Sequence, residues 1–586
     1  MFKTKQHIQK VRPMGTSSVS GFAPFTSIGS TLRADRMGLY KQYFKLTQHA
    51  LGIKRTENTK NGIALQMLIS QPISHGHLSI IIIGLFTLAM GIILSSIPWL
   101  DYIILKNLRL KEGSISFQYW QKPGVIRLTR VYIFNVTNPD GFLKQGEKPK
   151  LKEVGPFVYR EDMEKVNIKF HDNGTVSYQQ KKILKFVPEL SVDKNHKITV
   201  PNIPLLTLSS QSNNLGWFVQ RAISVMLSMG SLKPFVNITA DELVFGYDDS
   251  LVSLAHQFYP KRKKPQNKMG LLITRNGTLS EVQNIYTGDT DMQEFGLLAR
   301  INGRETLPYW SDAPCNDLRA SEGSFFPPRY FTNKDMVYIY DKDVCRTFPM
   351  QYRASGRKHG LDYDLYTSAD NIFDSVDENP ENKCFCPGNE FCPPKGLQNI
   401  SPCQYDAPVY LSFPHFLDAD PSLSAAVEGL IPKREIHESY FKIQPKLGVP
   451  VEGKVRVQLN LRVEQAPFIT PVKNFKTIIF PVMWLEEGID ELTPQIRRWM
   501  YLATTFAEIA CPLMTYGFIF FGSCLIIAVF VNAYKSLVFT KKSIEIGMKN
   551  LRRRSSVLIA APNRFITRRE TYTLLDFQDV DADGEV

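Results

Sequence analysis

The sequence LSIIIIGLFTLAMGIILSSIPWL, residues 78–100, contains no charged side chain. At about 1.5 Å of helix per residue, it is long enough to cross the roughly 30 Å hydrocarbon core of a bilayer. A second stretch, IACPLMTYGFIFFGSCLIIAVFVNA at residues 509–533, has the same character. The core helix of a soluble protein would carry a polar stripe, and neither stretch has one. The sequence therefore predicts two transmembrane helices.

The remainder of the chain has the composition of a water-soluble protein, because 22% of the 586 residues are charged. This composition excludes a transporter with many spans. The first apolar stretch lies too far from the N-terminus, and is too long, to be the core of a cleaved signal peptide. We expect it to remain in the protein as a signal anchor.

The formal net charge of +14 is concentrated near the two ends of the chain. The first 77 residues contain only two acidic side chains, Asp35 and Glu57, and a second basic run follows residue 534. Basic flanks beside apolar spans indicate cytoplasmic loops rather than a nucleic-acid partner. We expect cytoplasmic tails at residues 1–77 and 534–586, with residues 101–508 on the outer or luminal side.

Five glycosylation sequons lie in this outer segment, at Asn135, Asn173, Asn237, Asn276 and Asn399. The last is weak because Pro402 follows its serine. The Arg- and Ser-containing N-terminal tail superficially resembles a mitochondrial transit peptide. Sequons confined to one side of the membrane favour the secretory pathway instead, and the tail is expected to be disordered.

The outer segment is predicted to be mainly β-structure. Residues 455–463 (VRVQLNLRV) alternate apolar and polar side chains, which predicts a strand with one face buried and one in water. Residues 131–136 and 477–484 are further strand candidates. In contrast, residues 216–230 place apolar side chains at helical spacing with a narrow polar stripe, which includes Gln220 and Ser224.

Six of the eight cysteines lie between residues 315 and 403, at Cys315, Cys345, Cys384, Cys386, Cys392 and Cys403. An even number in an oxidising compartment indicates disulfides, and six cysteines allow fifteen pairings. A zinc site is the alternative, but no histidine has the spacing of a zinc finger. No cofactor is expected.

Several longer motifs make the chain resemble the class B scavenger receptor family, which includes the fatty-acid translocase, the lysosomal integral membrane protein type 2 and the insect sensory neuron membrane proteins. The resemblance covers roughly residues 78–540. It is carried by YIFNVTNP (132–139), EVGPFVYR (153–160), CFC (384–386), APVYLSFPHF (407–416) and PVMWLE (481–486).

The resemblance implies an α+β membrane protein in which two transmembrane helices flank an antiparallel β-barrel-like ectodomain. It further implies a helical bundle at the apex and a hydrophobic tunnel through the interior. Matching the order of the cysteines to the family pattern implies the pairs Cys315–Cys384, Cys345–Cys403 and Cys386–Cys392.

Family ligands dock at the apex, which corresponds here to the helix at residues 216–230. So wide an apolar surface requires either a helical bundle or a hydrophobic ligand to cover it. The candidate apical residues are Phe218, Ala222, Val225, Met226, Met229 and Lys233. The chain has only one lysine just after this helix, where relatives that bind modified lipoproteins have several, so polyanion binding is in doubt. The basic loop at residues 261–264 is interpreted as solvated surface.

The function that we expect is that of a non-enzymatic receptor for lipid, lipoprotein or secreted protein ligands, which takes up or transfers lipid or carries cargo inward. No catalytic motif competes with this reading, and His415, close to Asp418, is interpreted as structural. Two rivals remain. One is a two-span ion channel with Gly522 and Ser523 in a polar pore, and the other is an adhesion or sorting receptor without lipid transport.

The C-terminal tail contains a candidate sorting signal of the acidic dileucine type, with a tyrosine-based signal overlapping it. Its residues are Glu570, Tyr572, Leu574 and Leu575. An acidic residue and two leucines suit a basic adaptor surface with an apolar pocket. We therefore expect clathrin adaptors as partners and residence in the plasma membrane and in endosomal or lysosomal membranes.

Overall fold

A computed structural model of the chain describes residues 75–258, 267–333, 335–386, 392–538 and 545–553. The ectodomain is built around one antiparallel sheet of 13 strands. These are β1 (Val125–Val136), β2 (Leu151–His171), β3 (Thr175–Phe186), β6 (Gly277–Tyr286), β7 (Leu298–Ile301), β8 (Met336–Asp341), β9 (Arg346–Lys358), β10 (Leu361–Ser368), β11 (Gln398–Asn399), β12 (Val409–Ser412), β13 (Tyr440–Gln444), β14 (Val449–Val463) and β15 (Ile478–Leu492).

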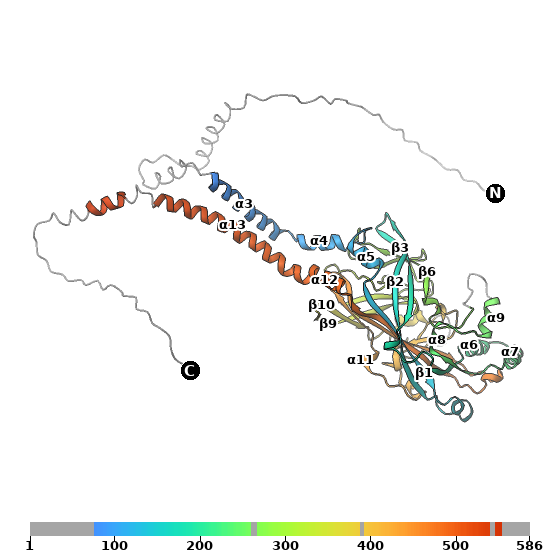
Figure 1. The fold of residues 1–586 in the computed structure, drawn as a ribbon. Coiled ribbons are helices and arrows are strands. Elements are labelled where there is room, and N and C mark those ends of the chain that lie inside the picture. The colour runs from blue at the N-terminus through green and yellow to red at the C-terminus, as the bar shows by residue number, and fades with distance from the viewer. Residues whose placement is uncertain (1–74, 259–266, 334, 387–391, 539–544, 554–586) are drawn as a thin grey trace, which may run out of the picture. The chain divides into compact units, whose positions relative to one another are not determined.

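The strands follow the order β7-β6-β3-β2-β1-β15-β14-β13-β10-β9-β8, with β12 beside β14 and β11 beside β12 (Figure 1). The edge strands β7 and β8 meet through Ser321. Its backbone pairs with Leu297, just before β7, and with Ile339 of β8. The sheet therefore closes into a barrel, which leaves fewer unpaired edges. A separate two-stranded sheet joins β4 (Lys197–Pro201) to β5 (Phe235–Thr239).

All three predicted strands are present as β1, β14 and β15, but one expectation about β14 is wrong. Its polar face is not in water, because Arg456, Gln458 and Asn460 are all buried. The amide of Asn460 donates to the Tyr410 carbonyl at 3.3 Å and to the Ser412 hydroxyl at 3.0 Å, both in β12. These partners belong to a strand that lies beside β14 in the sheet but is distant in the sequence, so the local alternation of residue types could not reveal them.

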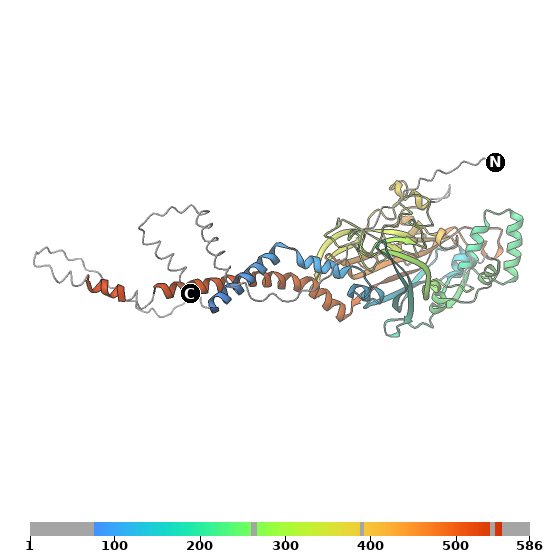
Figure 2. The ribbon, with the colours of Figure 1, turned by 90° about the horizontal axis from the view of Figure 1, so that it is seen from above.

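Short helices surround the barrel and cap its ends (Figure 1). They are α5 (Ile115–Gln121), α6 (Ile203–Ser212), α7 (Trp217–Met229), α8 (Ala240–Phe245), α9 (Ser250–Phe258), α10 (Pro421–Ala425), α11 (Arg434–His437) and α12 (Pro494–Tyr501). Both views place α6 and α7 at the end of the ectodomain opposite α12 (Figures 1 and 2).

The two apolar stretches form helices long enough to span a membrane. The first, α3 (His75–Ser96), ends before Pro98, and α4 (Trp99–Leu108) begins just after that proline. Proline lacks the amide hydrogen that a continuing helix needs, so the helix ends sooner than the expected residue 100. The second, α13 (Ala507–Val538), extends beyond the expected stretch at both ends.

Glycines allow α3 and α13 to approach each other closely. A methyl group on Gly522 would lie 2.7 Å from the backbone nitrogen of Leu88 and 2.8 Å from the carbonyl oxygen of Gly84. The neighbouring Ser523 hydroxyl donates to the Ile519 carbonyl of its own helix at 2.7 Å. Gly522 and Ser523 therefore serve packing and helix hydrogen bonding here, as small residues do between membrane helices.

Candidate functional site

Helix α7 lies at the exposed end of the ectodomain. It is amphipathic, but it turns polar side chains toward the protein and most of its apolar side chains toward the solvent. Gln220 and Ser224 are buried, so this part of the polar stripe faces the protein, whereas its other two residues, Arg221 and Ser228, are exposed. The Gln220 side-chain amide donates to the carbonyls of Asn213 at 3.2 Å and Leu215 at 2.8 Å. The Ser224 hydroxyl accepts from the backbone amide of Thr470 at 2.8 Å. These hydrogen bonds offset part of the cost of burying the Gln220 amide nitrogen and the Ser224 hydroxyl, although the side-chain oxygen of Gln220 has no hydrogen-bond partner in the described part of the chain.

The opposite, apolar face of α7 is exposed. Phe218 is 73% exposed and Met229 is 83% exposed, and the remaining candidate residues Ala222, Val225, Met226 and Lys233 are also on the surface. The structure adds Trp217 and Val219 to this surface. Their apolar character, directly before Phe218 and after it, was a signal that the sequence already contained. We call Trp217, Phe218, Val225, Met226 and Met229 the apical patch.

Three disulfides join Cys315 to Cys384, Cys345 to Cys403 and Cys386 to Cys392, with Cα–Cα distances of 5.8, 6.2 and 5.4 Å. These are the pairs that the resemblance implied. All six sulfurs are therefore engaged in bonds with each other rather than in a zinc site. Three local bridges between residues 315 and 403 favour a receptor over the two-span ion channel.

The sequons differ in accessibility. Asn173, Asn237 and Asn276 are exposed and Asn135 is half-buried. Asn399 is buried, and its side-chain oxygen accepts hydrogen bonds from the backbone amide and the hydroxyl of Ser401 at 2.9 and 2.6 Å. Because its side chain is buried and hydrogen-bonded, Asn399 is the least accessible of the five expected glycosylation sites.

A charged cluster occupies the interior of the barrel, where its members come from five different segments. Glu487 of β15 forms ion pairs with Arg127 at 3.4 Å, Lys182 at 3.4 Å and Arg275 at 2.5 Å. Lys182 also pairs with Glu161 at 3.1 Å. Burial alone would raise the pKa of Glu487, but the charges of Lys182, Arg275 and Arg127 outweigh it and hold this pKa well below its usual range.

Acidic groups near the cluster behave in the opposite way. Burial and the charge of Asp343 raise the pKa of Asp341 to about 6, although Arg275 opposes the shift. Burial also raises the pKa of Glu281. The Asp341 carboxyl group therefore takes up a proton as the surrounding pH falls from neutral to mildly acidic values.

Two adjoining cavities lie within the barrel at the end near α12. The first holds about 60 Å³ and is mainly apolar, with Tyr119, Trp120, Ile496 and Trp499 among its lining residues. The second holds about 100 Å³ and is lined by the charged cluster. Arg127 contributes to both cavities and marks the boundary between them. A continuous hydrophobic tunnel remains a prediction.

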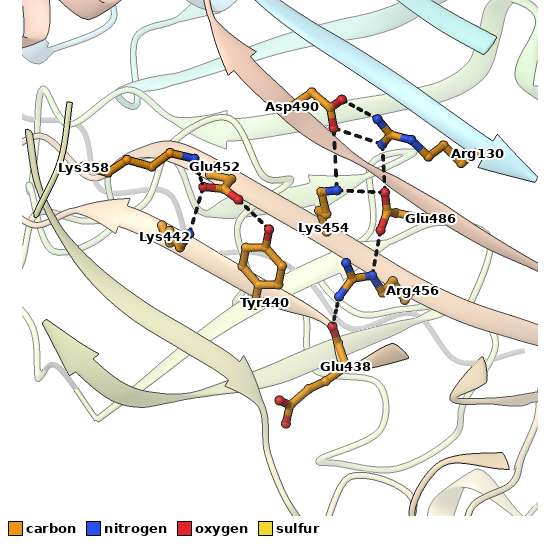
Figure 3. Close-up of polar contacts among 10 residues, drawn as sticks. All are labelled: Arg130, Lys358, Glu438, Tyr440, Lys442, Glu452, Lys454, Arg456, Glu486 and Asp490. Atoms are coloured by element: carbon orange, nitrogen blue, oxygen red, sulfur yellow. Dashed lines mark hydrogen bonds and ion pairs between the residues drawn. The ribbon is translucent and has the colours of Figure 1, made fainter. Parts of the chain in front are cut away.

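A second ionic network covers the outer face of the same strands (Figure 3). Glu486 accepts from Arg130 at 2.8 Å, Lys454 at 3.0 Å and Arg456 at 2.8 Å. Successive side chains of a strand point to opposite faces, so Glu486 joins the outer network while Glu487 joins the interior cluster. Alongside it, hydrogen bonds from Lys358, Tyr440 and Lys442 outweigh burial and lower the pKa of Glu452 to about 2.

His415 has a structural environment, as the sequence analysis expected. Its Nε2 lies 2.6 Å from a Glu153 oxygen, and its Nδ1 accepts from the Ile431 amide at 3.0 Å. The ring stacks on His437 with centroids 4.4 Å apart. Burial and the neighbouring His415 lower the pKa of His437 to about 4. Asp418 is not part of this cluster, because it pairs with Arg434 at 2.7 Å.

The candidate sorting residues Glu570, Tyr572, Leu574 and Leu575 lie outside the described residues, as does the basic loop at 261–264. The cytoplasmic placement of the two tails and the sorting signal therefore stay predictions from the sequence. The described functional candidates are the apical patch and the interior of the barrel.

Comparison with known proteins agrees with this architecture. The sequence model of the CD36 family matches residues 82–533. Scavenger receptor class B member 1 of Bos taurus is 33% identical over 409 residues, which cover 69% of this chain and 79% of the relative. Lysosome membrane protein 2 of Homo sapiens is 33% identical over 428 residues, which cover 72% and 87%. With its two membrane helices, closed antiparallel barrel and extended match, the chain belongs to the CD36 family.

Proposed function

We propose that this protein is a receptor whose apical patch binds a lipid, a lipoprotein or a protein ligand, and which takes up or transfers lipid or carries its ligand inward. The observation that supports it best is the outward apolar face of α7. Burying one such large apolar side chain against a ligand contributes about 1.5–3 kcal/mol. An exposed apolar patch of this kind is typical of an interaction site.

Lipid transfer would use the interior of the barrel. The apolar cavity beside α5 and α12 holds about 60 Å³, which is room for only a short end of an acyl chain, and a passing lipid would also cross the adjoining charged cavity. Both termini would lie in the cytoplasm, and the protein would reside in the plasma membrane and in endosomal or lysosomal membranes. The names of the two relatives, a scavenger receptor and a lysosome membrane protein, support these assignments.

The docking step is tested by Met226→Glu and Met229→Glu, which place a charge in the apical patch. The matched control is Leu190→Glu, because Leu190 is an exposed apolar residue outside the patch. Cells that express each variant are incubated with fluorescently labelled lipoprotein particles. We expect uptake to fall for the two apical variants and to persist for the control at equal surface levels. Normal uptake by well-expressed apical variants would show that α7 is only structural.

The transfer step is tested separately by mass spectrometry of the lipids released from the purified full-length protein. Bound lipid in stoichiometric amounts supports transfer. Uptake of whole particles without any lipid bound to the purified protein would favour the adhesion or sorting receptor.

The tail signal is tested by Leu574→Ala with Leu575→Ala, and by Tyr572→Ala. Loss of an adaptor contact should raise the amount of receptor at the cell surface and slow the internalisation of an antibody bound to the ectodomain. If both variants internalise at the normal rate, the tail is not the sorting device and the protein is a resident of the plasma membrane.

A further inference from the structure

The second membrane helix continues into the ectodomain without interruption. Helix α12, the π-helical turn η9 (Leu502–Phe506) and α13 follow one another with no intervening loop. Since a helix advances by about 1.5 Å per residue, the height of each residue above the span is fixed by its number. This continuity allows the level of the ectodomain relative to the membrane to be inferred.

The apolar surface of this helix is longer than the hydrocarbon core requires. Leu502, Phe506, Ile509 and Leu513 are all exposed, and their spacing of three or four residues places them on one helical face. From Leu502 to Ala533 the helix measures about 46 Å, which slightly exceeds the roughly 40–45 Å of a membrane with its headgroup layers and is well above the core of about 30 Å. The turn at Leu502–Phe506 therefore has the height of the headgroup layer.

Two turns of the barrel are tied to the helix at this height. Glu508 is the single charged residue between Arg498 and Lys535 in the sequence, and it forms an ion pair with Lys446 in the turn between β13 and β14. The Thr505 hydroxyl donates to the carbonyl of Gly360, in the turn between β9 and β10, at 2.8 Å. The end of the barrel that carries these turns is thus held beside the interfacial part of the helix.

Two arginines stand just above this part of the helix. Arg497 and Arg498 are exposed on α12, whereas their neighbours Ile496 and Met500 are buried against the barrel. Within the described part of the chain, neither arginine takes part in an ion pair. Arg498 lies four residues before Leu502, or about 6 Å higher, within reach of headgroup phosphates. A guanidinium group binds phosphate through two parallel hydrogen bonds.

We propose that Leu502 and Phe506 lie in the headgroup layer of the leaflet facing the ectodomain, and that Arg497 and Arg498 bind the phosphates of its phospholipids. The turns at Gly360 and Lys446 then rest on that leaflet. This surface is distinct from the apical patch, and the inference goes beyond the proposed function because it assigns a second partner, the phospholipid headgroups, to the opposite end of the ectodomain.

The contact is tested by site-specific photo-crosslinking of the full-length protein in nanodiscs of phosphatidylcholine and phosphatidylglycerol that carry a radioactive phosphate. The photoreactive residue p-benzoylphenylalanine replaces Leu502 or Phe506. Leu513, within the span, is the positive control, and the exposed Leu190 is the negative control. We expect lipid adducts at positions 502, 506 and 513 and none at 190. Adducts at 513 without adducts at 502 and 506 would overturn the proposal.

The role of the arginines is tested with the photoreactive residue at Tyr501. Replacing both arginines by glutamine should remove most phosphate-labelled adducts, whereas Arg497→Lys with Arg498→Lys should retain them because the charges remain. Lys194→Gln with Lys197→Gln, which changes two exposed lysines elsewhere, should have no effect. Unchanged adducts in the glutamine variant would contradict phosphate binding, and a thermal unfolding scan checks that each variant is folded.

Discussion

Helices α7 and α12 occupy opposite ends of the ectodomain and present opposite faces to their surroundings. α7 turns Gln220 and Ser224 inward and exposes its apolar side chains, whereas α12 buries Ile496 and Met500 and exposes two arginines. Both helices are amphipathic, so amphipathicity alone does not decide which face is buried. The inward face of α7 is polar because Thr470, Asn213 and Leu215 supply hydrogen-bond partners for it.

The difference separates two kinds of partner. An apolar surface that faces water stabilises contact with an apolar ligand. A pair of arginines beside a membrane helix suits anionic headgroups. If the two helices differ in this way, substitutions at matched positions should have unequal effects.

The largest effect is expected from an aspartate in the buried face of α12. Met500 is fully buried in an apolar cluster with Leu361, Leu447 and Ile496. Met500→Asp should therefore destabilise the protein by more than about 4 kcal/mol, because it buries an unpaired charge. Met229→Asp in α7 should leave thermal unfolding of the detergent-solubilised protein nearly unchanged. Equal losses of stability in both variants would show that the face of α7 is covered.

A smaller loss is expected from the buried polar stripe of α7. Ser224→Ala removes the hydroxyl that accepts from the Thr470 amide, and it should cost about 1–3 kcal/mol because that amide loses its partner. Ser228→Ala is the matched control, since the Ser228 hydroxyl only donates to the Ser224 carbonyl of its own helix. Denaturant unfolding measures both. A variant at Ser224 that is as stable as the control would mean that the stripe is not held inward.

The barrel between the two helices should respond to pH through Asp341. Its folded pKa of about 6 lies above the ordinary aspartate value of 3.8, so its ionisation destabilises the fold fully above pH 6 and not at all below pH 3.8. Asp341→Asn should therefore raise stability by about 1–2 kcal/mol at pH 7.4, with a gain that shrinks as the pH falls towards 4. A gain that is independent of pH would refute the assignment. His437 has the opposite effect on the pH dependence of stability, because its folded pKa of about 4 lies below the ordinary histidine value of 6.5. It destabilises the fold as the pH falls below 6.5.

The smallest effect on stability is expected at the sequons. Asn237 lies on β5 and Asn173 in the turn after β2, and both are exposed. Changing either to Gln should remove one glycan, visible as a mass shift, while stability changes by less than about 0.5 kcal/mol. Asn399→Gln should leave the mass of the glycans unchanged. Loss of a glycan from that variant would show that the segment around Asn399 is open in the cell.

Sequence patterns predicted the elements better than their surroundings. The two spans, the strands β1, β14 and β15 and the limits of α7 follow from runs of residue type, which are local properties. The interior cluster could not be predicted, because Glu487 lies 212 residues or more after its partners Arg127, Lys182 and Arg275, and only the closed barrel brings them together. The buried polar face of β14 and the inward polar face of α7 were missed for the same reason.

The barrel closes through the backbone of two residues, Ala320 and Ser321, which form a narrow seam in its wall. Every other neighbouring pair of strands along the wall shares a ladder of hydrogen bonds, whereas β7 and β8 are joined by the backbone of Ala320 and Ser321. Opening the wall here breaks the bonds from Leu298 to Ala320 and between Ser321 and β8, which are fewer than a full ladder. Glu322 and Tyr340, beside the seam, line the charged cavity. Water should therefore enter the interior through the barrel wall most easily at this seam. Along the wall, backbone amide hydrogen exchange should be fastest there.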